Sequence, residues 1–549
     1  MIATEAPQQR ERATTIFEKG APGRRAFVCS EIDVPAADPE VLLPARFRRA
    51  TPPRLPEVSE PEIVRHYVSL SKRNFDLDSG FYPLGSCTMK HNPRLHERAA
   101  ALDGHARLHP LQDPIRAQGA LELMYNLQQA LAEIAGLPYV SLQPSAGSHG
   151  ELAGVLLTRA YHESRGETRV KVLAPDTAHG TNPATVTMAG LQVVKLATEA
   201  AGGIDLDDLR AKTDTDVACL MLTNPNTLGV FDQNIEEIAE IVHEIGATLY
   251  YDGANLNAIM GHSRPGDMGF DIVHFNLHKS FTQPHGGGGP GSGPIAVSAR
   301  IAPFLPVPFV VCREDGEDAV GEEAEDRRPA GERPRIGRGA RARRVTFDLD
   351  HGGSPEGPGS RTIGRLRGFH GNYGCFVRAY AYIRSLGADG LKDASETAVL
   401  NANYLLARLG AQDLGEGRRL GDLLPLAHGK LCMHEFVLSG GPAKRELKLK
   451  TLDLAKRLLD FGYHPPTVYF PLLVEEALMV EPTETETRET LDAFVGAIAE
   501  VLREAMTEGP EVAQNAPYTT PVRRLDEVAA AKRPVVRQAP PAQPVARAD

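Results

Sequence analysis

Apolar and polar residues follow two different periods along the middle of the chain, and these periods predict its secondary structure. Residues 117–135 and 234–245 carry apolar side chains at the three- and four-residue spacing of amphipathic helices. Short apolar runs of the kind that form buried strands lie at 169–173, 192–196, 217–222 and 247–251. Strands that alternate with helices predict an α/β fold with a large, mostly parallel sheet that is covered on both faces.

The pattern changes after about residue 360. Helical spacing dominates at 376–387, 395–409 and 487–506, and one short apolar run at 433–438 is typical of a strand. This mixture predicts a second, smaller domain of the α+β type.

Three stretches lack apolar periodicity. The beginning of the chain is rich in Pro, Arg and Glu, and the end is rich in Pro and Ala. Residues 313–345 join an acidic run to eight arginines, so we expect a disordered or solvated insertion there. The expected organisation is an arm at 1–75, a large domain at 76–305, a linker with the insertion at 306–359, a small domain at 360–520 and a tail at 521–549.

Composition excludes several classes of protein. The 549 residues are 42% hydrophobic, and no apolar run reaches the roughly 20 residues that span a membrane. A net charge of −11 disfavours nonspecific binding of nucleic acid. The six cysteines are scattered without a CxxC pair, which fits a reducing cytosol, and the acidic N-terminus lacks the apolar core of a secretory signal. We therefore expect a cytoplasmic protein.

The strongest chemical signal is the pair Asp252 and Lys279. Asp252 ends the apolar run 247–251, and Lys279 lies in an uncharged segment bounded by glycines. Pyridoxal phosphate chemistry needs such a pair, because the lysine holds the cofactor as a Schiff base and the aspartate keeps the ring nitrogen protonated. A solvated loop lysine is the alternative. A nucleotide P-loop is excluded, since its glycines precede the Lys-Ser pair and here they follow it.

Two further segments could complete such a site. The small residues 145–150 precede an apolar-periodic stretch, and a helix that begins there offers free N–H groups to a phosphate. His179 follows the strand at 169–173 and could stack on a pyridine ring or simply bond within its turn. A metal site is disfavoured, because the candidate ligands His149, His179, His278 and His285 lack a metal-binding spacing.

Long motifs give the chain a close resemblance to a known family. They are GFYPLGSCTMKHNP (80–93), APDTAHGTNPATVTMAG (174–190), LTNPNTLGVF (222–231), YDGANLNAIMG (251–261) and FNLHKSFTQPHGGGGPGSGP (275–294). The family is glycine decarboxylase, the P-protein of the glycine cleavage system, and the resemblance covers roughly residues 60–530. In length and N-terminus the chain resembles subunit 2 of the two-subunit form, the half that carries the cofactor lysine.

The resemblance implies the fold-type I architecture of pyridoxal phosphate-dependent transferases, which is aspartate aminotransferase-like. In that comparison Lys279 matches the Schiff-base lysine and Asp252 its pyridinium partner. His179 matches the ring-stacking histidine. The phosphate-binding turn corresponds to Ala146, Gly147 and Ser148.

The implied activity is that of glycine dehydrogenase (aminomethyl-transferring). Glycine loses carbon dioxide, and its aminomethyl group passes to the lipoyl arm of the H-protein. The implied partners are glycine decarboxylase subunit 1, in a heterotetramer of two chain types, and the lipoylated H-protein. Another fold-type I enzyme, such as an aldolase, aminotransferase or amino-acid decarboxylase, would share Asp252 and Lys279. A silent scaffold subunit is a further alternative, against which Lys279 argues.

Overall fold

A computed structural model describes residues 14–537 except positions 29, 32, 52, 54, 287, 315–344 and 353. Most of the expected insertion at 313–345 and part of the expected tail therefore lie outside the described residues. Within the described ranges, each helix is too short or too polar to cross a bilayer.

The large domain is built on a seven-stranded sheet with the order β1-β7-β6-β5-β4-β2-β3. Its strands are β1 (Tyr139–Ser141), β2 (Lys171–Pro175), β3 (Gln192–Leu196), β4 (Val217–Leu222), β5 (Thr248–Gly253), β6 (Ile272–Phe275) and β7 (Ile295–Val297). All are parallel except β7, which runs antiparallel to both of its neighbours. The expected α/β fold with a mostly parallel sheet is confirmed.

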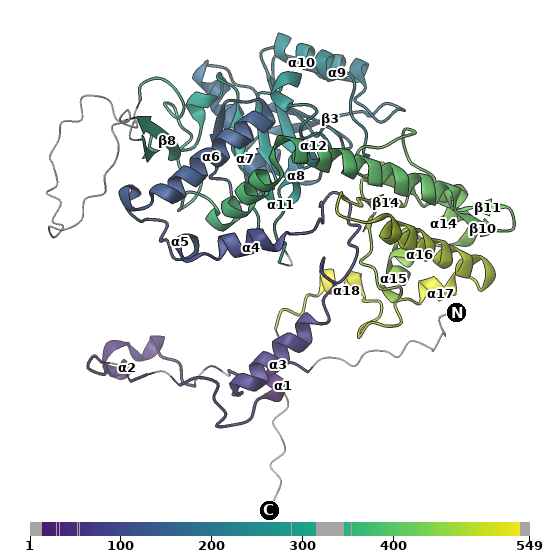
Figure 1. Cartoon of the computed structure of the whole chain (residues 1–549), viewed down its shortest axis with the longest axis horizontal. Coiled ribbons are helices and arrows are strands. Elements are labelled where there is room, and N and C mark those ends of the chain that lie inside the picture. The colour runs from purple at the N-terminus through teal and green to yellow at the C-terminus, as the bar shows by residue number, and fades with distance from the viewer. Residues whose placement is uncertain are drawn as a thin grey trace, which may run out of the picture.

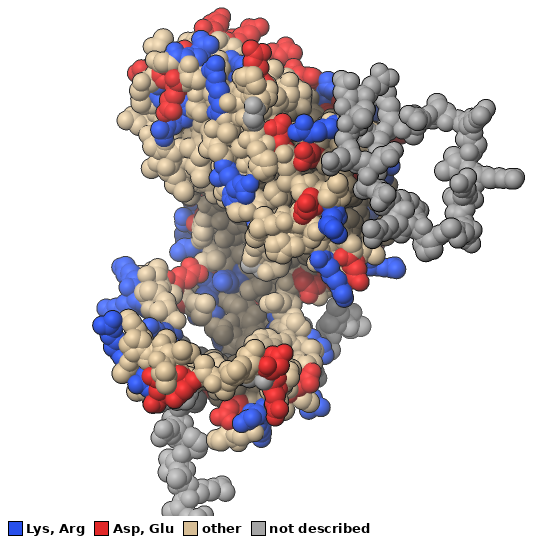
Figure 2. Space-filling view, turned by 90° about the vertical axis from the view of Figure 1, so that its left-hand side faces the viewer, with Lys and Arg blue, Asp and Glu red and all other residues tan. Residues whose placement is uncertain are grey.

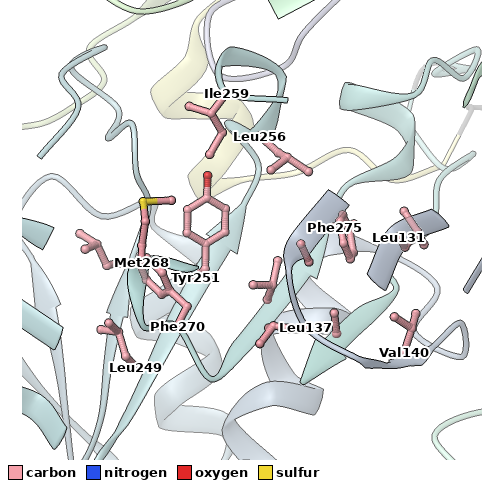
Figure 3. Packing of buried hydrophobic residues seen from close by; sticks show 14 of the residues in the cluster. Leu131, Leu137, Val140, Leu249, Tyr251, Leu256, Ile259, Met268, Phe270 and Phe275 are labelled. Carbon is pink, nitrogen blue, oxygen red and sulfur yellow. The ribbon is translucent and has the colours of Figure 1, made fainter. Parts of the chain in front are cut away.

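Alternate residues of the central strands enter two separate hydrophobic cores. In β5, Leu249 and Tyr251 pack in the cluster that contains α6 (Gln118–Ala135) and α10 (Ile235–Glu244), as Figure 3 shows for part of it. Tyr250 points to the other face and packs with α7 (Gly147–Ser164). Successive side chains of a strand point to opposite faces, so the consecutive apolar residues 249–251 of β5 hold helices on both sides of the sheet.

The small domain contains the antiparallel sheet β12-β14-β13. Its strands are β12 (Phe436–Ser439), β13 (Thr467–Val468) and β14 (Ala477–Val480), and α15 (Thr451–Asp460) and α16 (Arg488–Thr507) pack on it. The long helix α12 (Tyr373–Ala411) runs from one domain into the other (Figure 1). Its early residues join the large-domain core and its late residues the small-domain core. A non-helical Gly387 interrupts it where the first of the two expected helices ends.

An unexpected ribbon flanks the insertion. The strands β8 (Phe309–Glu314) and β9 (Val345–Asp350) pair antiparallel on either side of it. Helix α6 anchors both strands, because the Gln118 side chain donates to the Phe347 carbonyl at 2.7 Å and Gln128 donates to the Val310 carbonyl at 3.1 Å. Part of the expected linker is therefore regular structure that belongs to the large domain.

The arm extends away from the body of the molecule (Figure 1). It contains the short helices α1 (Ile16–Lys19) and α2 (Pro39–Leu42) and the longer α3 (Glu60–Ser71). Large apolar side chains of the arm are exposed, among them Phe27, Val41, Phe47 and Leu55. Figure 2 shows a hollow between the arm and the body.

Candidate active site

The polar candidates gather at one edge of the large sheet. Asp252 lies at the end of β5, His179 follows β2, and Lys279 lies in α11 (Leu277–Ser280) directly after β6. In parallel sheets, ligands bind outside the carboxyl ends of the strands. A cavity of about 250 Å³ opens there. Its lining includes all six predicted site residues, Lys279, Asp252, His179, Ala146, Gly147 and Ser148.

Lys279 projects into this cavity from α11. It is half-buried, and its Nζ donates a hydrogen bond of 2.7 Å to the carbonyl of Ser86. Ser86 adopts a left-handed backbone conformation with φ of 66° and belongs to the motif 80–93. That motif therefore lies against the edge of the sheet that carries Lys279, although about 190 residues separate the two in the sequence.

Asp252 is buried and surrounded by donors. Its carboxylate accepts from the Asn182 side chain and from the Ala254 backbone, both at 3.0 Å. His274 Nε2 lies 3.3 Å from it. Burial opposes ionisation, but the His274 ring, the Asn182 amide and the Lys279 charge outweigh it, so the pKa of Asp252 lies below its ordinary value. The side chain is thus a carboxylate that faces the cavity.

His274 is a member of the site that sequence reasoning missed. The register of β5 and β6 pairs Asp252 directly with His274, and Tyr250 Oη lies 2.6 Å from the other ring nitrogen. The signal was present in the sequence as a histidine inside an apolar run, but β6 is only four residues long and was not predicted.

His179 lies at the cavity wall in a neutral state. Its Nδ1 is 2.9 Å from the Thr181 hydroxyl, which donates to the Glu151 carboxylate at 2.8 Å. Burial, and secondarily the charge of Lys279, lowers the pKa of His179. Phe470 of the small domain meets the ring edge-on, with centroids 5.5 Å apart. A neutral imidazole held in this way can lie against a flat aromatic ligand.

The N-terminus of α7 forms the opposite wall. A side chain at position 147 would place its Cβ 2.0 Å from Asn276 Oδ1, so Gly147 lets the Asn276 side chain lie against the start of α7. The first N–H groups of an α-helix have no partner within the helix and carry the positive end of its dipole. An 18-residue helix that begins at the cavity is therefore a suitable seat for an anionic group.

Two buried glutamates of the small domain lie behind the motif 80–93. Glu435 precedes β12 and Glu481 follows β14, and the pairing of Phe436 with Val480 places them next to each other. Glu435 accepts from the Ser86 N–H at 2.8 Å, and Glu481 accepts from the Thr88 N–H at 2.9 Å. Sequence reasoning missed both, since only the folded chain brings them to this segment.

Burial makes both acids hard to ionise. It raises the pKa of Glu481 to about 7, and together with the neighbouring Glu481 carboxyl it raises the pKa of Glu435 well above its ordinary value. The folded protein then holds protons that the unfolded chain releases, so this contribution to stability is complete below about pH 4.5 and is lost as the pH rises through about 7.

Replacement of Glu481 by glutamine is expected to weaken this pH dependence. Urea unfolding at pH 5.5 and pH 8.5 should show a smaller loss of unfolding free energy in Glu481→Gln than in the unchanged protein, by about 1–3 kcal/mol. Glu489→Gln, at an exposed position of the same domain, is the control and should keep the original dependence. An unchanged slope in Glu481→Gln would show that this carboxyl ionises normally.

Comparison with family models identifies both parts of the chain. The model described as glycine cleavage system P-protein matches residues 40–324. The model described as glycine dehydrogenase, C-terminal domain, matches residues 394–518. Together they include the seven-stranded sheet with its cavity and the three strands of the small-domain sheet.

Individual relatives match over almost their whole length. The chain is 51% identical over 523 residues to a probable glycine dehydrogenase (decarboxylating) subunit 2 of Bacillus velezensis, covering 95% of this chain and 96% of the relative. It is 52% identical over 522 residues to the protein of the same name from Desulforamulus reducens, covering 95% and 98%.

Solved structures confirm the fold-type I architecture. A crystal structure of glycine decarboxylase (P-protein) in inhibitor-bound form superposes with a TM-score of 0.66 at 21% identity, covering 84% of this chain and 93% of the other. A sphingosine-1-phosphate lyase from Burkholderia pseudomallei has a TM-score of 0.54 at 15% identity, covering 89% and 94%. At these sequence identities the structural matches support the fold alone, whereas the sequence matches establish the family. The chain belongs to the family of glycine cleavage system P-proteins.

Proposed function

We propose that this chain is the cofactor-bearing subunit of a glycine decarboxylase. It binds pyridoxal phosphate at Lys279, releases carbon dioxide from glycine and transfers the remaining aminomethyl group to the lipoyl arm of an H-protein. The observation that carries the proposal is that Lys279 and the ionised Asp252 line one cavity whose far wall is the N-terminus of α7. The substrate, glycine, is inferred from the names of relatives that are about half identical to this chain.

The residues present fit pyridoxal phosphate. Asp252 would hold the ring nitrogen, His179 would lie against the ring, and Lys279 would bind the aldehyde carbon. The turn at Ala146, Gly147 and Ser148 would take the phosphate, where a side chain at Gly147 would collide with Asn276. When bound, this cofactor accepts the electron pair that a leaving carboxylate releases.

The protein groups have separate tasks in this reaction. Asp252 would keep the ring nitrogen of the cofactor protonated, because its own carboxyl is ionised at neutral pH. Lys279 would hold the cofactor, and its free Nζ has the Ser86 carbonyl as a hydrogen-bond acceptor at 2.7 Å. This carbonyl therefore keeps the free amine in the cavity.

An exchange experiment tests the reaction. The protein is mixed with its partner subunit, lipoylated H-protein, glycine and isotopically labelled bicarbonate, and label entering the carboxyl group of glycine is measured. Label should enter only when the H-protein carries lipoate. An aldolase or aminotransferase of the same fold would give no such exchange, and exchange without lipoate would contradict the proposed acceptor.

The chain is expected to need a second type of subunit. Its relatives are named as subunit 2, and its arm exposes apolar side chains such as Phe27, Val41 and Phe47 that a partner could cover. Purified alone, it should show little exchange between glycine and carbon dioxide until subunit 1 is added. Removal of residues 1–55 should weaken the association with subunit 1, as measured by analytical ultracentrifugation. Full activity of the isolated chain would refute the two-subunit proposal.

A further inference from the structure

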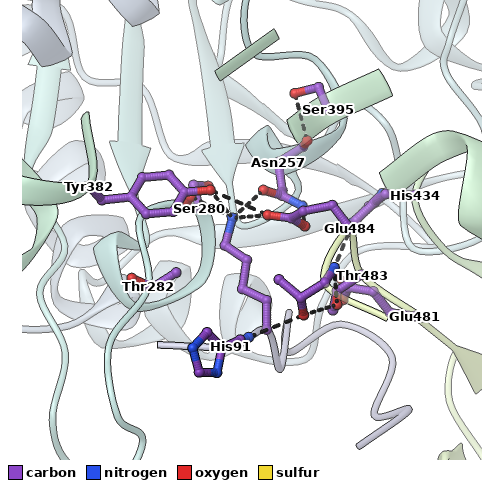
Figure 4. A network of polar contacts seen from close by, with 12 residues as sticks. His91, Asn257, Ser280, Thr282, Tyr382, Ser395, His434, Glu481, Thr483 and Glu484 are labelled. Atoms are coloured by element: carbon purple, nitrogen blue, oxygen red, sulfur yellow. Dashed lines mark hydrogen bonds and ion pairs between the residues drawn. The ribbon is translucent and has the colours of Figure 1, made fainter. Parts of the chain in front are cut away.

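Lys90 is a buried lysine for which the proposed chemistry has no role. Its side chain is only 1% exposed, and its Nζ has four hydrogen-bond partners (Figure 4). They are Asn257 Oδ1 at 2.7 Å, the Ser280 carbonyl at 2.8 Å, the Glu484 carboxylate at 2.8 Å and Tyr382 Oη at 3.1 Å. Burial of an ammonium group away from water costs free energy, so a fully buried lysine with four partners suggests that its contacts serve a function.

The partners of Lys90 come from both domains. Asn257 lies five residues after Asp252, and Ser280 is the residue directly after Lys279. Glu484 lies beyond β14 in the small domain, and it also accepts from Asn257 Nδ2 at 3.2 Å. Lys90 therefore connects the two segments that carry the cofactor-binding residues to a carboxylate of the other domain.

The charge of Lys90 strengthens its contacts with the two domains. Burial alone would lower the pKa of Lys90, but the facing Glu484 carboxylate outweighs it, with help from Tyr382, and the pKa lies above its ordinary value. The group is thus an ammonium at every pH at which the protein would work. Hydrogen bonds from a charged donor are shorter and stronger than neutral ones, so the Ser280 carbonyl is held more firmly than an ordinary loop carbonyl.

The segment that contains Lys90 also contacts the side chain of Lys279. The Ser86 carbonyl accepts from Lys279 Nζ, while Lys90 donates to the carbonyl of the residue that follows Lys279. One segment, 86–90, thereby fixes the side chain of the proposed cofactor lysine and the backbone next to it. The small domain holds the same segment through Glu435, Glu481 and Glu484.

We propose that Lys90 is a positioning residue for Lys279, and that it transmits the placement of the small domain to the cofactor-binding turn. This inference rests on the proposed function in one respect, namely that Lys279 is the lysine that binds the cofactor. Lys90 itself need not touch the cofactor. It acts by fixing the Ser280 carbonyl, and with it the end of the one-turn helix α11, against Glu484.

The experiment separates positioning from simple stabilisation. Lys90→Met leaves Glu484 buried without its counter-charge, so this variant should be destabilised. The double variant Lys90→Met with Glu484→Leu removes both charges and should recover much of the melting temperature, because replacement of a buried pair by apolar residues is often neutral. Lys444→Met is the control, because it breaks an ion pair with Glu476 in the small domain, and neither residue lines the cavity.

Two measurements then report on position. Hydrogen exchange in the cofactor-free protein follows the amides of Lys279 and Ser280, which bond to the Asn276 carbonyl at 2.9 and 3.2 Å. Titration with pyridoxal phosphate, followed by absorbance, gives the cofactor dissociation constant. In the double variant we expect faster exchange over residues 276–282 and at least about tenfold weaker cofactor binding, the change that loss of one or two charge-assisted bonds produces.

The outcomes are distinct. If the double variant regains the melting temperature, the exchange rates and the cofactor affinity of the unchanged protein, Lys90 is only part of a packing contact and the inference fails. Loss of exchange protection and affinity in Lys444→Met would also overturn it, because the effect would then be general to the domain. Neither measurement uses glycine or H-protein, so an error in the proposed reaction leaves the test intact, and absence of cofactor binding by the unchanged protein would refute the proposed function instead.

Discussion

Replacement of Lys279 by alanine is expected to abolish exchange between glycine and carbon dioxide while the protein stays folded. Among the described residues that line the cavity, Lys279 alone can form a covalent bond to an aldehyde through a side-chain amine. The loss should be at least about 10²–10⁴-fold, the range that positioned proton-transferring side chains contribute. Stability should change little, because Lys279 is half-buried and contributes one hydrogen bond rather than core packing.

Chemical labelling makes the assignment independent of activity. Borohydride reduction of the protein loaded with pyridoxal phosphate, followed by peptide mapping, should place the pyridoxyl group on Lys279. Lys171→Ala, at a surface lysine paired with Asp214, is the control and should keep both the label and the activity. A label on another lysine would refute the role proposed for Lys279.

Asp252→Asn is expected to keep the cofactor bound and to lose most of the decarboxylation rate. The amide has the same shape as the carboxylate, but it is neutral and cannot hold a proton on the nitrogen opposite to it. In the folded protein the pKa of Asp252 lies below its ordinary value, so the carboxyl is ionised throughout the neutral pH range. The loss of rate in Asp252→Asn should therefore be the same across that range. We expect a loss of about 10²–10⁴-fold in exchange rate, with cofactor content measured by absorbance.

The control for this variant is Asp214→Asn, since Asp214 is an exposed carboxylate that pairs with Lys171. It should leave the rate unchanged. If Asp252→Asn retained nearly the original exchange rate, the carboxylate would not act on the ring nitrogen, and the electron-accepting role of the site would need another source. The circular dichroism and melting temperature of the variant should match those of the unchanged protein. A loss of activity could then not be attributed to a collapsed pocket around Asp252 and His274.

The sequence predicted the longer, strongly apolar strands of the large domain and missed its short ones. The strands β3 and β4 begin and end at the predicted residues, and β2 is shifted by two. In contrast, β1, β6 and β7 have three or four residues each and were not predicted. A strand of this length has too few positions to show a period, and its formation depends on neighbouring strands that are distant in sequence.

The residues of the site also fall into two groups, those that could be proposed from the sequence and those that could not. Asp252, Lys279 and the turn at Ala146 to Ser148 could be proposed because they lie next to recognisable strands and helices and in family motifs. Ser86, Glu435 and Glu481 could not, because each acts through a contact between distant parts of the chain. The residues proposed to react could be predicted from the sequence, whereas the residues that contact and hold their segments could be identified only in the fold.

The contacts of segment 86–90 with the small domain also bear on how the protein is made. The Thr88 and Lys90 contacts with Glu481 and Glu484 span 393 and 394 residues. During synthesis, the large sheet and Lys279 emerge from the ribosome long before these carboxylates exist, and domains fold in the order in which they appear. A nascent chain that ends before residue 481 therefore contains all six predicted site residues, yet it lacks Glu481 and Glu484, two of the three small-domain carboxylates that hold segment 86–90. We therefore expect segment 86–90 to reach its final position only after the last part of the chain has been made.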